Sequence, residues 1–197
     1  QTTPTEILKL KTFDALIQEQ EPSGNFVILN ITEDDVEKEG GYPLPRKRLA
    51  DIQLEILGKG ALGVGWVISF PQPDRLMGDK EFAMSLGYAP SVIATFEDGN
   101  ENYPKTTGTV IKGPDVGGLS STGVKQNFYL YDDIPQGVAI APTEVDQLVR
   151  RIPLLLRTPD GWAASFGTHV LKSLTGARTY IITTNENGVQ EIAVRGI

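Results

Sequence analysis

The sequence contains no cysteine, a single histidine and no long hydrophobic run. The absence of cysteine excludes a disulfide scaffold, thiolate catalysis and cysteine-ligated zinc. The single histidine, His169, leaves no second imidazole for a histidine-based metal site. No apolar run approaches the roughly 18 residues that cross a bilayer. Basic residues are also few, 18 against 25 acidic ones, and form no dominant cluster, so we expect no nucleic-acid partner.

The chain does have length and apolar content. It has 197 residues, of which 40% are hydrophobic, which is enough to build a core without cross-links. No linker separates its two halves, so we expect a single domain over residues 1–197. The sequence begins at Gln1 without a methionine or a signal peptide and ends at Ile197 inside a predicted strand. We therefore expect it to be a piece of a longer protein.

The first half of the chain alternates helix and strand signals. Apolar residues recur at helical spacing in the leading segment 1–20, and glycines or prolines end most of the later segments. The predicted helices are residues 5–20, 32–39, 46–57 and 79–86, and the predicted strands are residues 26–31, 62–70 and 91–96. This order favours an α/β fold with a parallel β-α-β core over residues 26–96 and helices on the sheet faces.

The second half changes in character. Residues 97–126 are a long loop region with one short strand predicted at 109–111, and residues 127–197 form a mixed or antiparallel section. Its predicted elements are strands at 127–131 and 149–157, a turn at 158–161, a helix at 162–174 and a hairpin of 180–184 with 189–194. The hairpin prediction rests on an Asn-Gly pair, which favours the positive φ angles of a tight turn.

No motif in the sequence supports catalysis. Gly58 to Gly63 matches the dinucleotide-binding pattern, but it closes a helix and opens a strand, which is the reverse of the required context. His169 lacks a carboxylate at helical spacing, and Ser165 lacks the preceding glycine of a hydrolase elbow. The carboxylates lack calcium-loop spacing. We therefore expect no catalytic residue, no metal and no cofactor. We interpret Arg150 and Arg151 as an exposed strand face, and a surface that binds an anion or a headgroup is the alternative.

Four segments in order resemble the signatures of the type-two CHASE domain, the "cyclases/histidine kinases associated sensory extracellular" domain. They are residues 27–36 (VILNITEDDV), 41–46 (GYPLPR), 60–70 leading into Pro73-Asp74-Arg75, and 149–155 (VRRIPLL), and Leu10 to Asp14 resembles the helix that leads into that domain. Family members commonly carry Asp at the positions of Asn30, Thr32 and Val67, so part of the acidic pattern is neutral in this chain.

The resemblance implies an extracytoplasmic sensor in a membrane receptor. It implies anchoring through flanking membrane segments, a homodimeric full-length receptor and a cytoplasmic nucleotide cyclase or kinase as output. The domain itself is then not an enzyme, and its ligand is an unidentified small molecule. The alternative is a dimerisation and spacer module without a specific ligand. A third hypothesis, a free-standing enzyme, depends on His169 or Asp74.

A ligand in an open α/β sheet binds beyond the carboxyl ends of the parallel strands. We expect that crevice to be formed by Asn30, Thr32, Glu33, Arg46, Phe70, Gln72, Asp74, Arg75, Phe96 and Glu97. A structural role is the alternative for Arg46 and Asp74, which both stand at turns and are candidates for bracing them.

Overall fold

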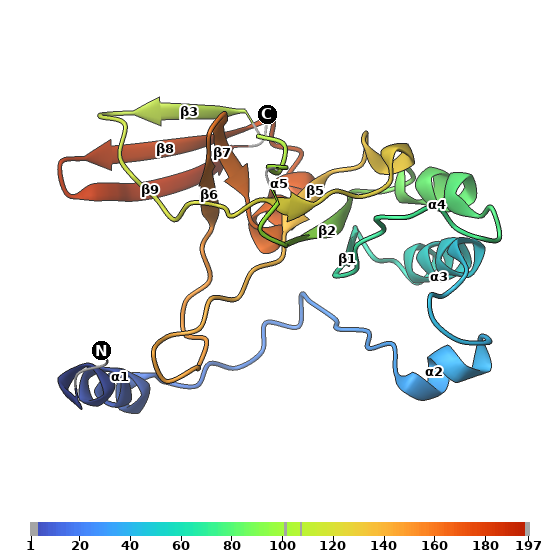
Figure 1. The fold of residues 1–197 in the computed structure, drawn as a ribbon, viewed down its shortest axis with the longest axis horizontal. Helices are drawn as coiled ribbons and strands as arrows, with labels where there is room; N and C mark the ends of the chain where they lie inside the picture. Colours follow the sequence, from blue (N-terminus) through green and yellow to red (C-terminus); the bar gives the residue numbers. More distant parts are fainter. Residues whose placement is uncertain (1–3, 101, 107, 196–197) are drawn as a thin grey trace. The chain divides into compact units, whose positions relative to one another are not determined.

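A computed structural model describes residues 4–100, 102–106 and 108–195 (Figure 1). The chain divides into two compact units. The first unit comprises Gln1–Pro43 and Ala141–Ile152, and the second comprises Leu44–Ile140 and Pro153–Ile197. The α/β class predicted from the sequence is confirmed, since helices alternate with a parallel sheet in the second unit.

The first unit contains two helices, α1 (Pro4–Leu16) and α2 (Glu33–Lys38). The predicted cap of α2 is confirmed: the Thr32 hydroxyl accepts from the amide of Asp35, and Asp35 Oδ2 accepts from the Thr32 amide at 3.0 Å. Helix α1 lies beside the loop 141–152 (Figure 1), where Arg150 binds Asp14. Polar contacts therefore organise this unit.

The predicted strand at residues 26–31 is wrong. The segment is irregular, and the apolar side chains of residues 26–29 are exposed, from 63% at Leu29 to 93% at Ile28. A strand exists only through hydrogen bonds to a neighbour, and no strand among the described residues pairs with this one. The apolar run predicts that this segment is buried. It does not show whether another strand lies beside the segment to pair with it.

The second unit contains the parallel sheet. Strand β2 (Ser91–Glu97) lies between β1 (Val64–Trp66) and β5 (Gln136–Val138), parallel to both, and its end pairs antiparallel with β4 (Val124–Lys125). Helices α3 (Arg46–Gly58) and α4 (Asp79–Leu86) lie side by side (Figure 1) and match the predicted ranges closely. Strand β1 is shorter than the predicted 62–70.

The second half of the chain adds two smaller sheets to this unit. Strands β8 (Thr179–Asn185) and β9 (Gly188–Arg195) form the predicted hairpin, and β3 (Thr109–Lys112) pairs parallel with β8. Strands β6 (Leu155–Thr158) and β7 (Gly161–Ala164) form a second hairpin. Their inward side chains meet those of β8 in one apolar cluster, which contains Leu155, Trp162, Ala164, Tyr180 and Ile182.

Three of the elements predicted for the second half of the chain differ from those in the structure. The predicted strand at 127–131 is a short 3-10 turn, η1 (Tyr129–Tyr131), and the strand at 149–157 begins only at Leu155. The predicted helix at 162–174 begins at Phe166, as α5 (Phe166–Leu174), because Trp162 to Ala164 pair with β6 instead. The tight turn before Gly161 brings two buried strands together, and this pairing overrides the helical preference of the alanines.

Candidate functional site

The residues predicted to bind a ligand are distributed over both units. In the first unit, Asn30 lies exposed in the irregular segment before α2. Thr32 caps α2, and Glu33 is the first residue of that helix. The structure therefore places two of these three residues at one helix end, where Thr32 already has a capping role.

A hollow of about 720 Å³ lies next to α2. Predicted site residues Thr32 and Glu33 line it, together with Ile31, Val36, Glu37, Gly40, Gly41 and Tyr42. Gly40 and Gly41 adopt φ angles of +85° and +109°, a backbone conformation that favours glycine, and they turn the chain back around the helix end. The hollow thus combines two carboxylates and a tyrosine ring on a turn fixed by its glycines.

In the second unit, Arg46 belongs to a buried polar cluster. Its side chain forms an ion pair with Asp79, with 3.7 Å between Nε and Oδ1, and both side chains are less than a tenth exposed. The Tyr131 hydroxyl donates to Asp79 Oδ1 at 2.6 Å, and the Arg46 guanidinium donates to the Leu44 carbonyl at 3.2 Å. A buried charge requires partners of this kind, because unpaired burial is costly.

Asp74 and Phe70 support the same cluster. Oδ2 of Asp74 accepts hydrogen bonds from the amides of Arg46 and Gly78, at 3.2 and 3.0 Å. The Phe70 ring lies 4.5 Å from the guanidinium carbon of Arg46. The structure thus brings three predicted residues together. Their contacts favour the bracing alternative, since the Asp74 carboxylate binds the first amide of α3 and the Gly78 amide just before α4.

The surroundings of Tyr131 keep its phenol protonated near neutral pH. Burial raises the pKa of the Tyr131 phenol above its ordinary value, and the hydrogen bond to Asp79 raises it further. The phenol is therefore neutral and acts as a donor to the carboxylate. Aromatic rings surround it, with the Phe82 ring centroid at 5.9 Å and the Phe70 centroid at 5.5 Å. The arrangement stabilises the α3–α4 region.

The remaining predicted residues do not join this cluster. Gln72 and Arg75 are exposed on the connection before α4, and Phe96 is exposed near the end of β2. Glu97 accepts a hydrogen bond from the Thr122 amide at 2.9 Å. The carboxyl end of β2 therefore holds a loop in place.

The sequence reasoning missed Asp79 and Tyr131 as members of the cluster. The sequence predicts Asp79 only as the start of a helix and Tyr131 as part of a strand. The aromatic-Asp-Asp run at 131–133 offered no signal for a partner 52 residues earlier. Only the tertiary fold brings the two side chains together.

A second hollow, of about 440 Å³, lies in the second unit. Arg157 is its charged residue, and the other lining residues are Tyr103, Gly117, Gly118, Ser120, Ser121, Thr158 and Pro159. The guanidinium of Arg157 pairs with Asp115 at 2.7 Å and lies 4.8 Å from the Trp162 ring centroid. Since its charge is already neutralised, Arg157 chiefly braces the loop before β4.

His169 lies on α5, partly buried. Burial lowers its pKa to about 4, and the nearby Lys172 lowers it in the same direction. The imidazole is therefore neutral at pH 7, and its Nδ1 has no hydrogen-bond partner among the described residues. The Ser165 hydroxyl pairs with Thr168 at 3.0 Å and is not activated by His169. These contacts do not form a nucleophile and base pair.

Comparison with known families identifies the family of the chain. A model of the CHASE2 domain matches residues 1–195, a range that includes both units. Comparison with curated proteins and with solved structures finds no match. In the described part of the chain, no three His, Asp or Glu side chains are grouped so that they could hold a metal ion. Within the same residues, every helix is too short or too polar to span a bilayer.

Proposed function

The chain belongs to the CHASE2 domain family, a family of extracellular sensory domains, and on this premise we propose that it is the ligand-sensing part of a membrane receptor. The match over residues 1–195 carries the proposal. The receptor is anchored through flanking membrane segments as a homodimer, with this domain on the periplasmic or extracellular side. Its output is a cytoplasmic nucleotide cyclase or kinase. The ligand acts by binding two conformations of the domain with different affinity.

The hollow next to α2 is the ligand site of this proposal. Its volume of about 720 Å³ lies in the range of small-molecule sites. Glu33 and Glu37 lie one helical turn apart on its wall, and neither carboxylate pairs with a cation among the described residues. Carboxylates and the face of the Tyr42 ring both attract positive charge. These groups favour a small organic cation as the ligand.

A thermal-shift screen tests this site. The panel contains small amines, amino acids and quaternary ammonium compounds, and a ligand at 100 times its Kd stabilises the protein by about 2.7 kcal/mol. The double variant Glu33→Gln with Glu37→Gln should lose the shift. Glu81→Gln, on α4 and outside the hollow, should retain it. The site is wrong if a compound stabilises all three proteins equally, and ligand sensing by organic cations is wrong if no compound acts.

A second candidate function is a dimerisation and spacer module. The exposed apolar side chains of residues 26–29 favour it, because contiguous apolar surface usually has a partner. Light scattering over a range of concentrations tests this role. The spacer hypothesis predicts a dimer that Ile28→Asp dissociates and that the control Leu62→Asp leaves intact. A monomer at all concentrations contradicts it.

A further inference from the structure

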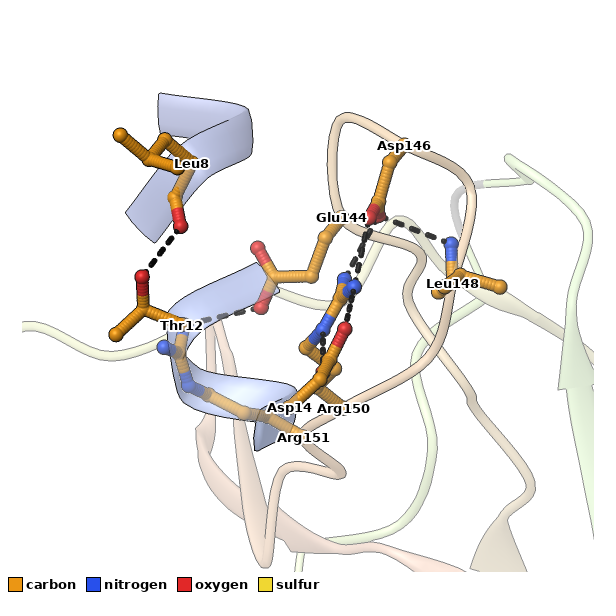
Figure 2. Close-up of polar contacts among 8 residues, drawn as sticks. All are labelled: Leu8, Thr12, Asp14, Glu144, Asp146, Leu148, Arg150 and Arg151. Carbon is orange, nitrogen blue, oxygen red and sulfur yellow. Dashed lines mark hydrogen bonds and ion pairs between the residues drawn. The ribbon is translucent and has the colours of Figure 1, made fainter. Parts of the chain in front are cut away.

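We propose that Arg150 is a latch that fastens α1 to the loop 141–152, and that α1 has a fastened and a released state. The latch consists of Arg150 with Asp14 and Asp146 (Figure 2). Its use in signalling rests on the function proposed above, because a sensor needs a segment with two states. The latch itself requires no ligand and is tested without one.

Arg150 binds each of its two carboxylate partners in a bidentate manner. Nε and Nη2 of Arg150 donate to the two oxygens of Asp14, at 2.7 and 2.8 Å. Nη1 and Nη2 donate to the two oxygens of Asp146, at 2.7 and 2.6 Å. The side chain of Arg150 is only 4% exposed, against 42% for Asp14 and 21% for Asp146. The two carboxylates therefore enclose the guanidinium, a geometry that lysine cannot reproduce.

The two carboxylates belong to different elements. Asp14 stands in the last turn of α1, where a negative charge opposes the helix dipole unless a cation neutralises it. Asp146 is fixed within the loop, since its Oδ1 accepts from the Leu148 amide at 3.3 Å. The positively charged Arg150 holds the pKa of both carboxyl groups below their usual range, and that of Asp146 at about 2. Arg150 thus joins two elements 136 residues apart in sequence.

Arg151 adds a second contact between the same elements. Its guanidinium donates to Glu144 at 3.0 Å and lies 5.8 Å from the Phe13 ring centroid (Figure 2 draws Glu144 and Arg151). The interpretation of Arg150 and Arg151 as an exposed strand face is therefore wrong. These residues lie in a loop, where consecutive side chains of one chain segment both reach α1.

Helix α1 has little else to hold it. It is 13 residues long, and Leu10 is its only buried residue among those described. Isolated helices of this length are marginal in water, so most of their stability must come from contacts with the rest of the protein. A helix held chiefly by charged groups can be released without opening an apolar core. The latch therefore gives α1 a low-energy route between two states.

Hydrogen exchange on the 197-residue chain tests the latch. In Arg150→Gln, the amides of residues 5–16 should exchange about tenfold faster or more, because the released helix approaches an unstructured peptide. Asp14→Asn should act in the same direction and serves if Arg150→Gln does not fold. The matched control is Arg157→Gln, which removes an arginine paired with Asp115 and should leave α1 unchanged.

Two results overturn the proposal. The first is unchanged exchange in α1 in both latch variants. The second is an equal increase in exchange in α1 and in β2 and β8, which would make Arg150 a general stabiliser of the fold. Neither result depends on the ligand screen, so failure of the latch and failure of ligand sensing are distinguishable.

Discussion

The two units differ in what stabilises them. The second unit buries an aromatic cluster of Trp66, Phe70, Phe82 and Tyr131 and two further apolar clusters around β4, β6 and β8. Among the described residues of the first unit, the only buried hydrophobic side chain is Leu10. The first unit depends instead on the capping box at Thr32 and the latch at Arg150.

This difference means that the two units of the sensor domain differ in how easily they open locally. Close-packed apolar clusters respond to perturbation as a whole, whereas a segment held by a few polar contacts opens locally at lower free energy. The second unit is thus suited to be a rigid frame and the first to contain the moving parts. Substitutions in each unit test that division.

Phe82→Ala should remove the centre of the aromatic cluster. Phe82 is fully buried, and its ring contacts those of Trp66, Phe70 and Tyr131. Truncation should lower the free energy of unfolding of the second unit by about 3–5 kcal/mol, measured by urea denaturation. Met84→Ala on the exposed face of the same helix is the control, and a loss below about 1 kcal/mol in Phe82→Ala would contradict the frame role.

Tyr131→Phe should test the polar part of the same frame. The substitution keeps the ring and removes the hydroxyl that donates to Asp79 at 2.6 Å. Hydrogen bonds to charged groups contribute about 1.5–3 kcal/mol, and a loss of this size is expected in the same denaturation experiment. Tyr129→Phe, whose hydroxyl is on an exposed side chain, should change stability little. Equal effects of the two variants would show that the buried network adds nothing.

The frame should also be sensitive to acid through His169. Its folded-state pKa of about 4 lies below the ordinary 6.5, so the neutral form is the one the fold favours. The associated stability is fully present above pH 6.5 and is lost as the pH falls through 4, by roughly 3 kcal/mol. The difference between the stability curves of the wild type and His169→Gln isolates this effect, because the carboxylates titrate in both. Parallel curves would contradict it.

Thr32→Ala should have the smallest and most local effect. Loss of the cap should destabilise α2 by about 1 kcal/mol, because the Asp35 amide loses its acceptor. Hydrogen exchange should accelerate in residues 33–38, while the unfolding midpoint of the second unit stays unchanged. The control is Glu37→Gln on the same helix. If Thr32→Ala lowers the unfolding midpoint of the second unit, the two units are not separate in stability, and the division into a rigid frame and a mobile unit is wrong.

The elements predicted most closely are those whose own residues indicate where they begin and end. Helices α3 and α4 end at glycines, and the β8–β9 hairpin closes on Asn187-Gly188. The strand predicted at 26–31 and the helix predicted at 162–164 are wrong because strand formation depends on a partner elsewhere in the chain. The pairs Arg46–Asp79, Tyr131–Asp79 and Arg150–Asp14 are beyond prediction for the same reason, since the two partners of each pair are distant in sequence.

The run from Phe26 to Ile31 also affects the behaviour of the chain in concentrated solution. Six residues without charge or proline and with high β-propensity are typical of segments that stack into cross-β assemblies. Acidic residues flank this run, with Glu19 and Glu21 before it and Glu33 to Asp35 after it. In-register stacking brings these like charges together, which opposes growth. The acidic excess of the sequence thus acts as a gatekeeper whose protection weakens as salt screens it.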